Sequence, residues 1–276
     1  MALVYGNPYP AAITYNTRGV FLKKKIIIIV ASLLIIAGVV LGAVAIVRNN
    51  KIEEYKRNKG GLPMNFTYTA HTGCCGTEDN SIASIEKGAS HGAQIVEFDL
   101  RFDENETPVL CHDEVKGGEV TLEEAFKKIS EYDNLRVNVD AKSCEALWKV
   151  QELAGEYNVL NRIFFTGIEE KDVDAVKMSA PAVDYYLNMS VEKPSEHTEE
   201  YLQTLVDKVK ECGAIGINFN KKSASKELVD YFHANGLLVS IFTVDDKVEM
   251  YKILSYAPDN ITTRCPDDLQ EILKEF

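Results

Sequence analysis

Two acidic residues spaced one apart, Glu97 and Asp99, precede a histidine at His112. Successive side chains of a β-strand point to opposite faces, so Glu97 and Asp99 would share one face. The polar residues 103–106 predict a turn, and a reversal near Asn105 would pair Asp99 with His112 across an antiparallel hairpin. Two carboxylates suit a hard divalent cation such as Mg²⁺ or Ca²⁺, and an imidazole transfers protons near neutral pH. The pattern predicts a hydrolytic metal site; the alternative is a solvated hairpin with ordinary surface acids.

Further chemically capable residues lie at the ends of other predicted strands. His71 ends a strand expected over residues 66–71, and Asp140 and Lys142 lie near the end of a strand expected over residues 136–142. Alternation along that strand puts Asp140 and Lys142 on one face. Each has an ordinary structural explanation by itself, but their shared position at strand ends favours a common site.

Nine strand-like segments between residues 66 and 263 alternate with amphipathic helix-like segments. The exception is the short gap between residues 102 and 108, where only a turn fits. If this segment is a hairpin, eight strands remain for parallel pairing, because parallel strands need long crossovers and the other gaps supply them. We therefore predict a (β/α)₈ TIM barrel with one extra hairpin strand over residues 65–276, with active residues at the carboxyl ends of its strands. A doubly wound open sheet is the alternative, because alternation alone fits both.

The amino-terminal part predicts a membrane segment. Residues 26–47 carry no charged side chain, and a helix of this length would cross a bilayer. A cleaved signal peptide is the competing interpretation, but its apolar core would be shorter and nearer the start of the chain. We expect a tail over residues 1–25 and a polar stalk over residues 48–64. Gly38 and Gly42 could let two anchors pack as a weak dimer, although a monomeric anchor is favoured.

Charge divides the chain in the same way. The formal net charge is −12; the first 60 residues hold nine basic and two acidic residues, a balance of +7, so the rest of the chain has a balance of −19. An acidic domain is a poor nucleic-acid binder, so that class of partner is excluded. Lys and Arg flank both ends of the apolar segment and leave its orientation open; we favour a single-pass protein with its catalytic domain on the extracytoplasmic side. The six cysteines show neither zinc spacing nor a disulfide framework.

Four short motifs, taken in order, resemble the pattern of the glycerophosphodiester phosphodiesterase family. The likeness continues through the Asp140-x-Lys142 strand and covers nearly all of residues 66 to 270. The four motifs are His71-Thr72-Gly73, Glu78-Asp79-Asn80-Ser81, Glu97-Phe98-Asp99 and His112-Asp113.

The resemblance implies a barrel that hydrolyses glycerophosphodiesters to glycerol 3-phosphate and an alcohol, with a divalent metal ion, Mg²⁺ or Ca²⁺. It assigns metal binding to three carboxylates, acid and base catalysis to two histidines, and substrate binding to three further residues. In that order these are Glu97, Asp99 and Asp140; His71 and His112; and Lys142, Phe242 and Thr72.

Three positions depart from the family pattern. Thr72 stands where the family has an arginine that grips phosphate, and a hydroxyl lacks both the charge and the bidentate fork. Asp140 replaces the usual glutamate, and Phe242 stands where a tryptophan is frequent and keeps an apolar wall.

The favoured function is therefore a membrane-anchored metal-dependent phosphodiesterase. Thr72 motivates one alternative, a catalytically weak barrel that only binds glycerol phosphates. The apolar segment motivates another, a lysophospholipase D-like enzyme that acts on lysophospholipids in the membrane.

Overall fold

A computed structural model of the chain describes residues 17–276, which divide between Lys51 and Ile52 into two units. In the first unit the described backbone is part of helix α1 (Thr17–Arg57). Of the predicted tail, residues 1–16 lie outside the described part. The helical range Ile29–Arg57 contains a strongly apolar part, none of which is buried, and this fits either a membrane anchor or a signal sequence. Pairing of two copies through Gly38 and Gly42 stays a prediction.

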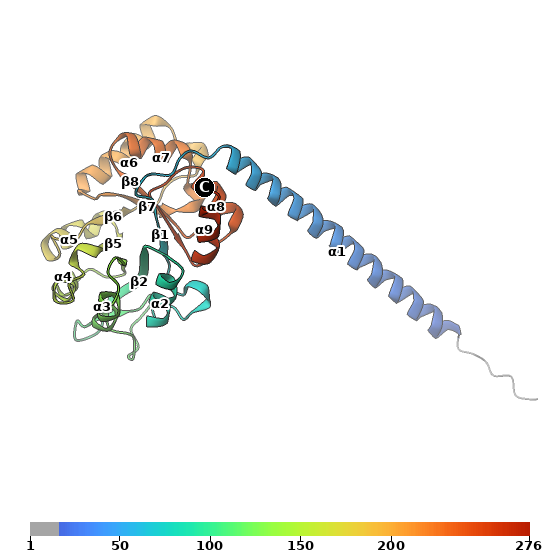
Figure 1. Cartoon of the computed structure of the whole chain (residues 1–276), viewed down its shortest axis with the longest axis horizontal. Helices are drawn as coiled ribbons and strands as arrows, with labels where there is room; N and C mark the ends of the chain where they lie inside the picture. The colour runs from blue at the N-terminus through green and yellow to red at the C-terminus, as the bar shows by residue number, and fades with distance from the viewer. Residues whose placement is uncertain (1–16) are drawn as a thin grey trace, which may run out of the picture. The chain divides into compact units, whose positions relative to one another are not determined.

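The second unit is the predicted barrel. Eight parallel strands close on themselves, since β1 pairs with both β2 and β9, and one further strand, β3, pairs antiparallel with β2 (Figure 1). The strands are β1 (Thr67–Ala70), β2 (Ile95–Phe102), β3 (Pro108–Leu110), β4 (Arg136–Ala141), β5 (Ile163–Ile168), β6 (Tyr185–Asn188), β7 (Gly216–Asn220), β8 (Leu238–Phe242) and β9 (Asn260–Thr263).

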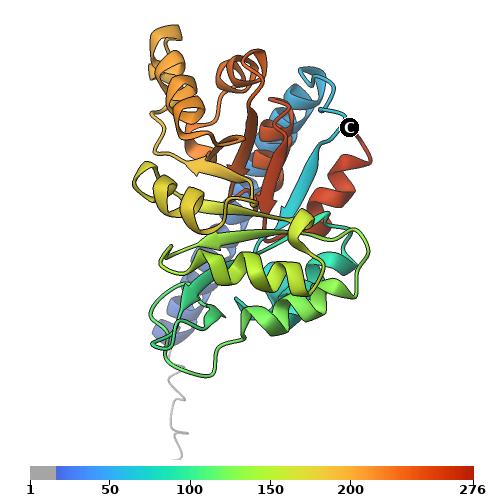
Figure 2. The same ribbon diagram turned by 90° about the vertical axis from the view of Figure 1, so that its left-hand side faces the viewer.

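Helices lie on the outside of these strands, as Figure 2 shows from a second direction. Several begin at a side-chain cap that accepts a backbone N–H of the first turn; Thr121, for example, forms a capping box with Glu124. The helices are α2 (Ile82–Ser90), α3 (Leu122–Ser130), α4 (Leu147–Glu156), α5 (Val173–Ser179), α6 (Glu199–Cys212), α7 (Lys226–Ala234), α8 (Lys247–Leu254) and α9 (Pro266–Leu273).

Strand alternation separates two kinds of core. Outward-facing side chains such as Phe98 and Val139 pack against the helices in one large apolar cluster. The barrel interior holds a small apolar group that includes Ile95, Phe164 and Tyr186. Further along the same faces, polar side chains such as Asn138 and Asn218 are buried instead. These buried polar side chains form a layer inside the barrel near the carboxyl ends of the strands, and this layer positions the site.

The hairpin differs from its prediction by one residue. Leu100 pairs with Leu110, and the N–H of Cys111 donates to the carbonyl oxygen of Asp99 at 3.0 Å. Asp99 therefore lies opposite Cys111, and the predicted pairing with His112 is wrong. The observed pairs are symmetric about Asn105, so Asp99 meets Cys111; pairing with His112 would need the centre of the turn to lie half a residue further along the chain, between Asn105 and Glu106.

The chain joins the barrel at the amino-terminal ends of the strands. There Lys56 forms an ion pair of 2.6 Å with Glu275, and Lys59 donates to the carbonyl oxygen of Glu275 at 2.6 Å. Both contacts lie just beyond the carboxyl end of α9. This part of the predicted stalk is therefore packed on the barrel, on the face opposite the carboxyl ends of the strands.

Candidate active site

Three carboxylates meet at the carboxyl ends of two neighbouring strands. Glu97 and Asp99 lie on β2 and Asp140 on β4, with Asp99 and Asp140 in register. One oxygen atom of each lies within 4.8 Å of the others. Glu97 and Asp99 are only 5% and 3% exposed, so water does little to screen their mutual repulsion. The arrangement is the one predicted from the sequence for these three residues.

A single lysine partly balances this charge. The Nζ atom of Lys142 lies 3.0 Å from Oδ1 of Asp99 and 2.5 Å from Oδ2 of Asp140. Burial alone would lower the pKa of the Lys142 ammonium, but the two carboxylates outweigh it and the pKa is raised. Burial, together with repulsion by Asp99 and Asp140, raises the pKa of Glu97 well above its usual value. One ammonium group against three carboxylates leaves an excess of negative charge.

The cluster fits a divalent cation. Its donors are all oxygen atoms, which hard cations such as Mg²⁺ and Ca²⁺ prefer, and its excess charge has the matching sign. Beside it lies a hollow of about 40 Å³, lined among others by His71, Glu97 and Asp140, which is ample for an ion and inadequate for a whole diester. Glu97, Asp99 and Asp140 are the residues that would hold the ion.

The loop after β1 orients two of the carboxylates. The backbone N–H of Thr72 donates to Oε2 of Glu97 at 2.8 Å. Asn80 bonds Asp99 twice, because its Nδ2 donates to Oδ2 at 2.9 Å and its Oδ1 accepts the backbone N–H of Asp99 at 2.9 Å. The Thr72 hydroxyl in turn accepts the N–H of Asn80. Thr72 is only 2% exposed. Its side chain, which was predicted to bind substrate, is therefore buried within the loop after β1 and bonds that loop's own backbone.

The third carboxylate is held from β5. The Thr166 hydroxyl lies 2.8 Å from Oδ1 of Asp140 and 2.8 Å from Oδ1 of Asn138. The next residue, Gly167, has φ +77°, and a Cβ there would lie 2.4 Å from the Ala141 carbonyl oxygen and 2.8 Å from Oδ1 of Asp140. Only glycine combines this backbone conformation with so close an approach.

The two predicted catalytic histidines have different surroundings. His71 is partly buried beside the carboxylates, with Nδ1 2.9 Å from the Thr72 carbonyl oxygen and 3.5 Å from Oε2 of Glu97. Burial lowers the pKa of His71, and the nearby positive charge of Arg264 lowers it further. The His112 side chain is 65% exposed, and its Nδ1 lies 2.9 Å from Oδ1 of Asp113. His112 does not line the hollow beside the carboxylates.

Other residues complete the site. Phe242, the predicted apolar wall, does line the hollow, and so do the amides of Asn188 and Asn218. No role was predicted from the sequence for these asparagines, for Thr166 or for Arg264. The sequence did contain a signal for the two asparagines. Each lies at an inward-facing position near the end of a strand, where a barrel usually has an apolar side chain.

Comparisons with known proteins converge on one family. Residues 61–127 and 115–268 match the model of the glycerophosphoryl diester phosphodiesterase family. A glycerophosphodiester phosphodiesterase of Caldanaerobacter subterraneus subsp. tengcongensis is 24% identical over 232 residues, which cover 71% of this chain and 93% of that protein.

Two solved structures show the same fold. A glycerophosphodiester phosphodiesterase of Parabacteroides distasonis has a TM-score of 0.62 and 21% identity, over 78% of this chain and 98% of that one. A phosphodiesterase of Oleispira antarctica, solved in complex with the product sn-glycerol-3-phosphate, has a TM-score of 0.60 and 19% identity, over 77% of this chain and 97% of that one.

Proposed function

The chain belongs to the glycerophosphoryl diester phosphodiesterase family, and we propose that it hydrolyses glycerophosphodiesters to glycerol 3-phosphate and an alcohol, using a divalent cation held by Glu97, Asp99 and Asp140. As a member of this family it is a phosphoric diester hydrolase. The observation that carries the proposal is the cluster of three carboxylates, two of them buried, around a single lysine. A cation bound there would neutralise charge on the phosphoryl group and lower the pKa of a coordinated hydroxyl.

His71 is the proposed general base. Its Nδ1 lies 2.9 Å from the Thr72 carbonyl oxygen, a contact in which Nδ1 is the donor, and this leaves Nε2 free to accept a proton. Burial and Arg264 both lower the pKa of His71, which favours the neutral ring that a base requires. His112 is the proposed general acid, oriented by the contact of its Nδ1 with Asp113.

The test is release of glycerol 3-phosphate from glycerophosphocholine by the full-length chain in detergent. We expect turnover with Mg²⁺, Ca²⁺ or Mn²⁺, loss of turnover in EDTA, and recovery when metal is returned. His71→Asn should reduce kcat by about a hundredfold or more while metal affinity changes little. No turnover of any glycerophosphodiester with any of these metals would refute the proposed activity.

A second candidate is a barrel that binds glycerol phosphates and turns them over poorly. It is favoured by one observation, the buried Thr72 hydroxyl, which offers no cation to phosphate. Calorimetry separates the two candidates. Metal-dependent binding of glycerol 3-phosphate without hydrolysis of any diester would support the binding barrel.

We further propose that the apolar part of α1 anchors the chain in a membrane as a single pass, with the barrel on the extracytoplasmic side. Its length, its hydropathy and the absence of buried residues in its most apolar window support an anchor. Sequencing the amino terminus of the mature protein tests this, because a cleaved signal sequence would remove the segment. Protease added to intact cells should digest the barrel; digestion of the tail alone would reverse the orientation.

A further inference from the structure

The hairpin that leads to His112 is joined to β2 over a short distance. β3 pairs with β2 over Pro108–Leu110, and one further backbone bond runs from the N–H of Cys111 to the carbonyl oxygen of Asp99 at 3.0 Å. His112 comes next in the chain, beyond the last of these pairs. Its side chain is 65% exposed, so packing does little to hold it. A general acid must nevertheless be held in place to deliver its proton.

Arg101 makes a contact to β2 at the point where the backbone pairing ends. It lies on β2 two residues after Asp99, so strand alternation puts it on the same face as Glu97 and Asp99. The Nε atom of Arg101 donates to the carbonyl oxygen of His112 at 2.9 Å. The strand that carries two of the three carboxylates is thereby bonded directly to the main chain of the proposed general acid.

The same guanidinium acts on the carboxylate beside the His112 ring. Oδ1 of Asp113 lies 2.9 Å from Nδ1 of His112. This contact lowers the pKa of Asp113 most, and the positive charge of Arg101 lowers it further. Arg101 therefore faces both the main chain of His112 and the carboxylate that orients its ring.

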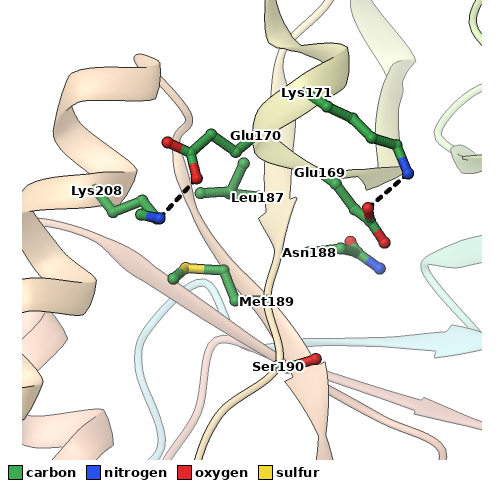
Figure 3. A pocket seen from close by; sticks show the side chains of 8 residues that line it. All are labelled: Glu169, Glu170, Lys171, Leu187, Asn188, Met189, Ser190 and Lys208. Carbon is green, nitrogen blue, oxygen red and sulfur yellow. Dashed lines mark hydrogen bonds and ion pairs between the residues drawn. The ribbon is translucent and has the colours of Figure 1, made fainter.

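Arg101 differs from neighbouring cations in the kind of partner it has. Figure 3 shows Lys171 and Lys208 beside a hollow of about 580 Å³, each in an ion pair with a glutamate, at 2.7 Å and 2.6 Å. Lys142 likewise pairs with two carboxylates. The Nε atom of Arg101 is bonded instead to a main-chain oxygen. A bond of this kind fixes the position of a segment, whereas the ion pairs balance charge.

We infer that Arg101 is a positioning residue that holds His112 where it can protonate the leaving alcohol; this rests on the proposed function, in which His112 is the general acid. As the bond between phosphorus and the alcohol oxygen breaks, the proton of the His112 ring passes to that oxygen, while His71 takes the proton of the attacking oxygen. A displacement of about 1 Å in such a group can cost on the order of a hundredfold in rate. Without Arg101, the main chain of His112 loses its hydrogen bond to β2.

The test uses the dependence of the rate on the leaving group. The choline oxygen needs a proton as it leaves glycerophosphocholine, whereas 4-nitrophenolate leaves the 4-nitrophenyl diester of glycerol phosphate without one. In the full-length chain, Arg101→Met should lower kcat for glycerophosphocholine about ten- to a hundredfold and change kcat for the 4-nitrophenyl diester little. His112→Ala should show the same selectivity, and the double variant should be no slower on glycerophosphocholine than His112→Ala alone, because Arg101 acts through His112.

Arg162→Met is the matched control. The Nη1 atom of Arg162 also donates to a main-chain carbonyl oxygen, that of Tyr132, but Arg162 immediately precedes β5 and so lies at the amino-terminal end of the barrel. This variant loses the same kind of bond away from the site. It should leave the ratio of the kcat values for the two diesters unchanged.

Each outcome bears on the inference. Equal loss on both diesters in either single variant, no loss on glycerophosphocholine in Arg101→Met, or a further loss in the double variant would overturn it while hydrolysis of glycerophosphodiesters stands. A wild-type chain that cleaves neither diester would overturn the proposed function as well. Turnover of the 4-nitrophenyl diester by Arg101→Met would itself show that the variant is folded.

Discussion

The contact between Asn80 and Asp99 gives the most direct test of how the carboxylates are held. Asn80→Gly removes the amide that donates to Oδ2 of Asp99 and accepts its backbone N–H, both at 2.9 Å. Asp99 is 3% exposed, so water cannot readily replace these partners. Glycine is the appropriate replacement because Asn80 has φ 56°, a left-handed conformation that glycine adopts without strain.

The expected magnitude follows from those two hydrogen bonds. A bond to a charged group contributes about 1.5 to 3 kcal/mol and a neutral one about 0.5 to 1.5 kcal/mol. The metal-free Asn80→Gly chain should therefore lose about 2 to 4 kcal/mol of unfolding free energy, which for a unit of this size lowers Tm by roughly 4 to 16 °C. Affinity for the metal should fall about 10- to 100-fold, as is usual when a residue that orients a ligand is removed.

Asn158→Gly is the matched control. Asn158 has φ 58°, is exposed and lies beyond α4, away from the carboxylates. Both substitutions raise the conformational entropy of the unfolded chain by the same amount. The difference between the two variants in unfolding free energy and in metal affinity therefore reports the contact between Asn80 and Asp99. Thermal unfolding of the metal-free chains and calorimetric titration with Mg²⁺ or Ca²⁺ would measure it. Equal effects of the two substitutions on Tm and metal affinity would refute the reasoning.

Three further predictions concern the same site. Because the pKa of Glu97 is raised in the folded metal-free chain, the stability linked to its proton is present below its ordinary value near 4.5 and is lost as the pH rises through the raised pKa. Tm of the metal-free chain should fall over that interval and Glu97→Gln should flatten the fall; identical pH profiles of the two chains would contradict this. Gly167→Ala should destabilise the chain by about 1 to 3 kcal/mol more than Gly236→Ala, which shares a positive φ but has open space around its Cβ, and should also weaken metal binding by calorimetry. His112→Ala should lower kcat by about a hundredfold or more with metal affinity unchanged, whereas parallel loss of metal binding would make the imidazole a ligand.

The fold was predictable because its signals are periodic. Alternation of strand-like and helix-like segments indicates a parallel sheet, and the short gap between residues 102 and 108 identifies the one connection that cannot be a crossover. The structure confirms eight parallel strands plus β3 in residues 52–276. The carboxylate cluster was predictable for the same reason, since residues at the carboxyl ends of adjacent parallel strands must meet.

The hairpin register was not predictable from polarity alone. A turn can be placed within residues 103–106 from its composition, but its centre depends on which residue takes the left-handed conformation. That residue is Glu106 (φ 57°), and glutamate has no special preference for the left-handed conformation. The one-residue difference places Cys111 opposite Asp99 and leaves the side chain of His112 65% exposed.

Thr72 shows most clearly what a sequence departure can and cannot mean. From the sequence, Thr72 replaces an arginine that would bind phosphate. In the structure its side chain is buried and accepts the backbone N–H of Asn80. Because Asn80 in turn bonds Asp99, Thr72 helps to hold Asp99 in place. The cation for phosphate must then come from elsewhere. Lys142 is bonded to Asp99 and Asp140, the same carboxylates that would hold a metal. A cation shared by those carboxylates competes with the Lys142 ammonium for their charge, and we expect the ammonium to be available to phosphate only in the metal-bound chain.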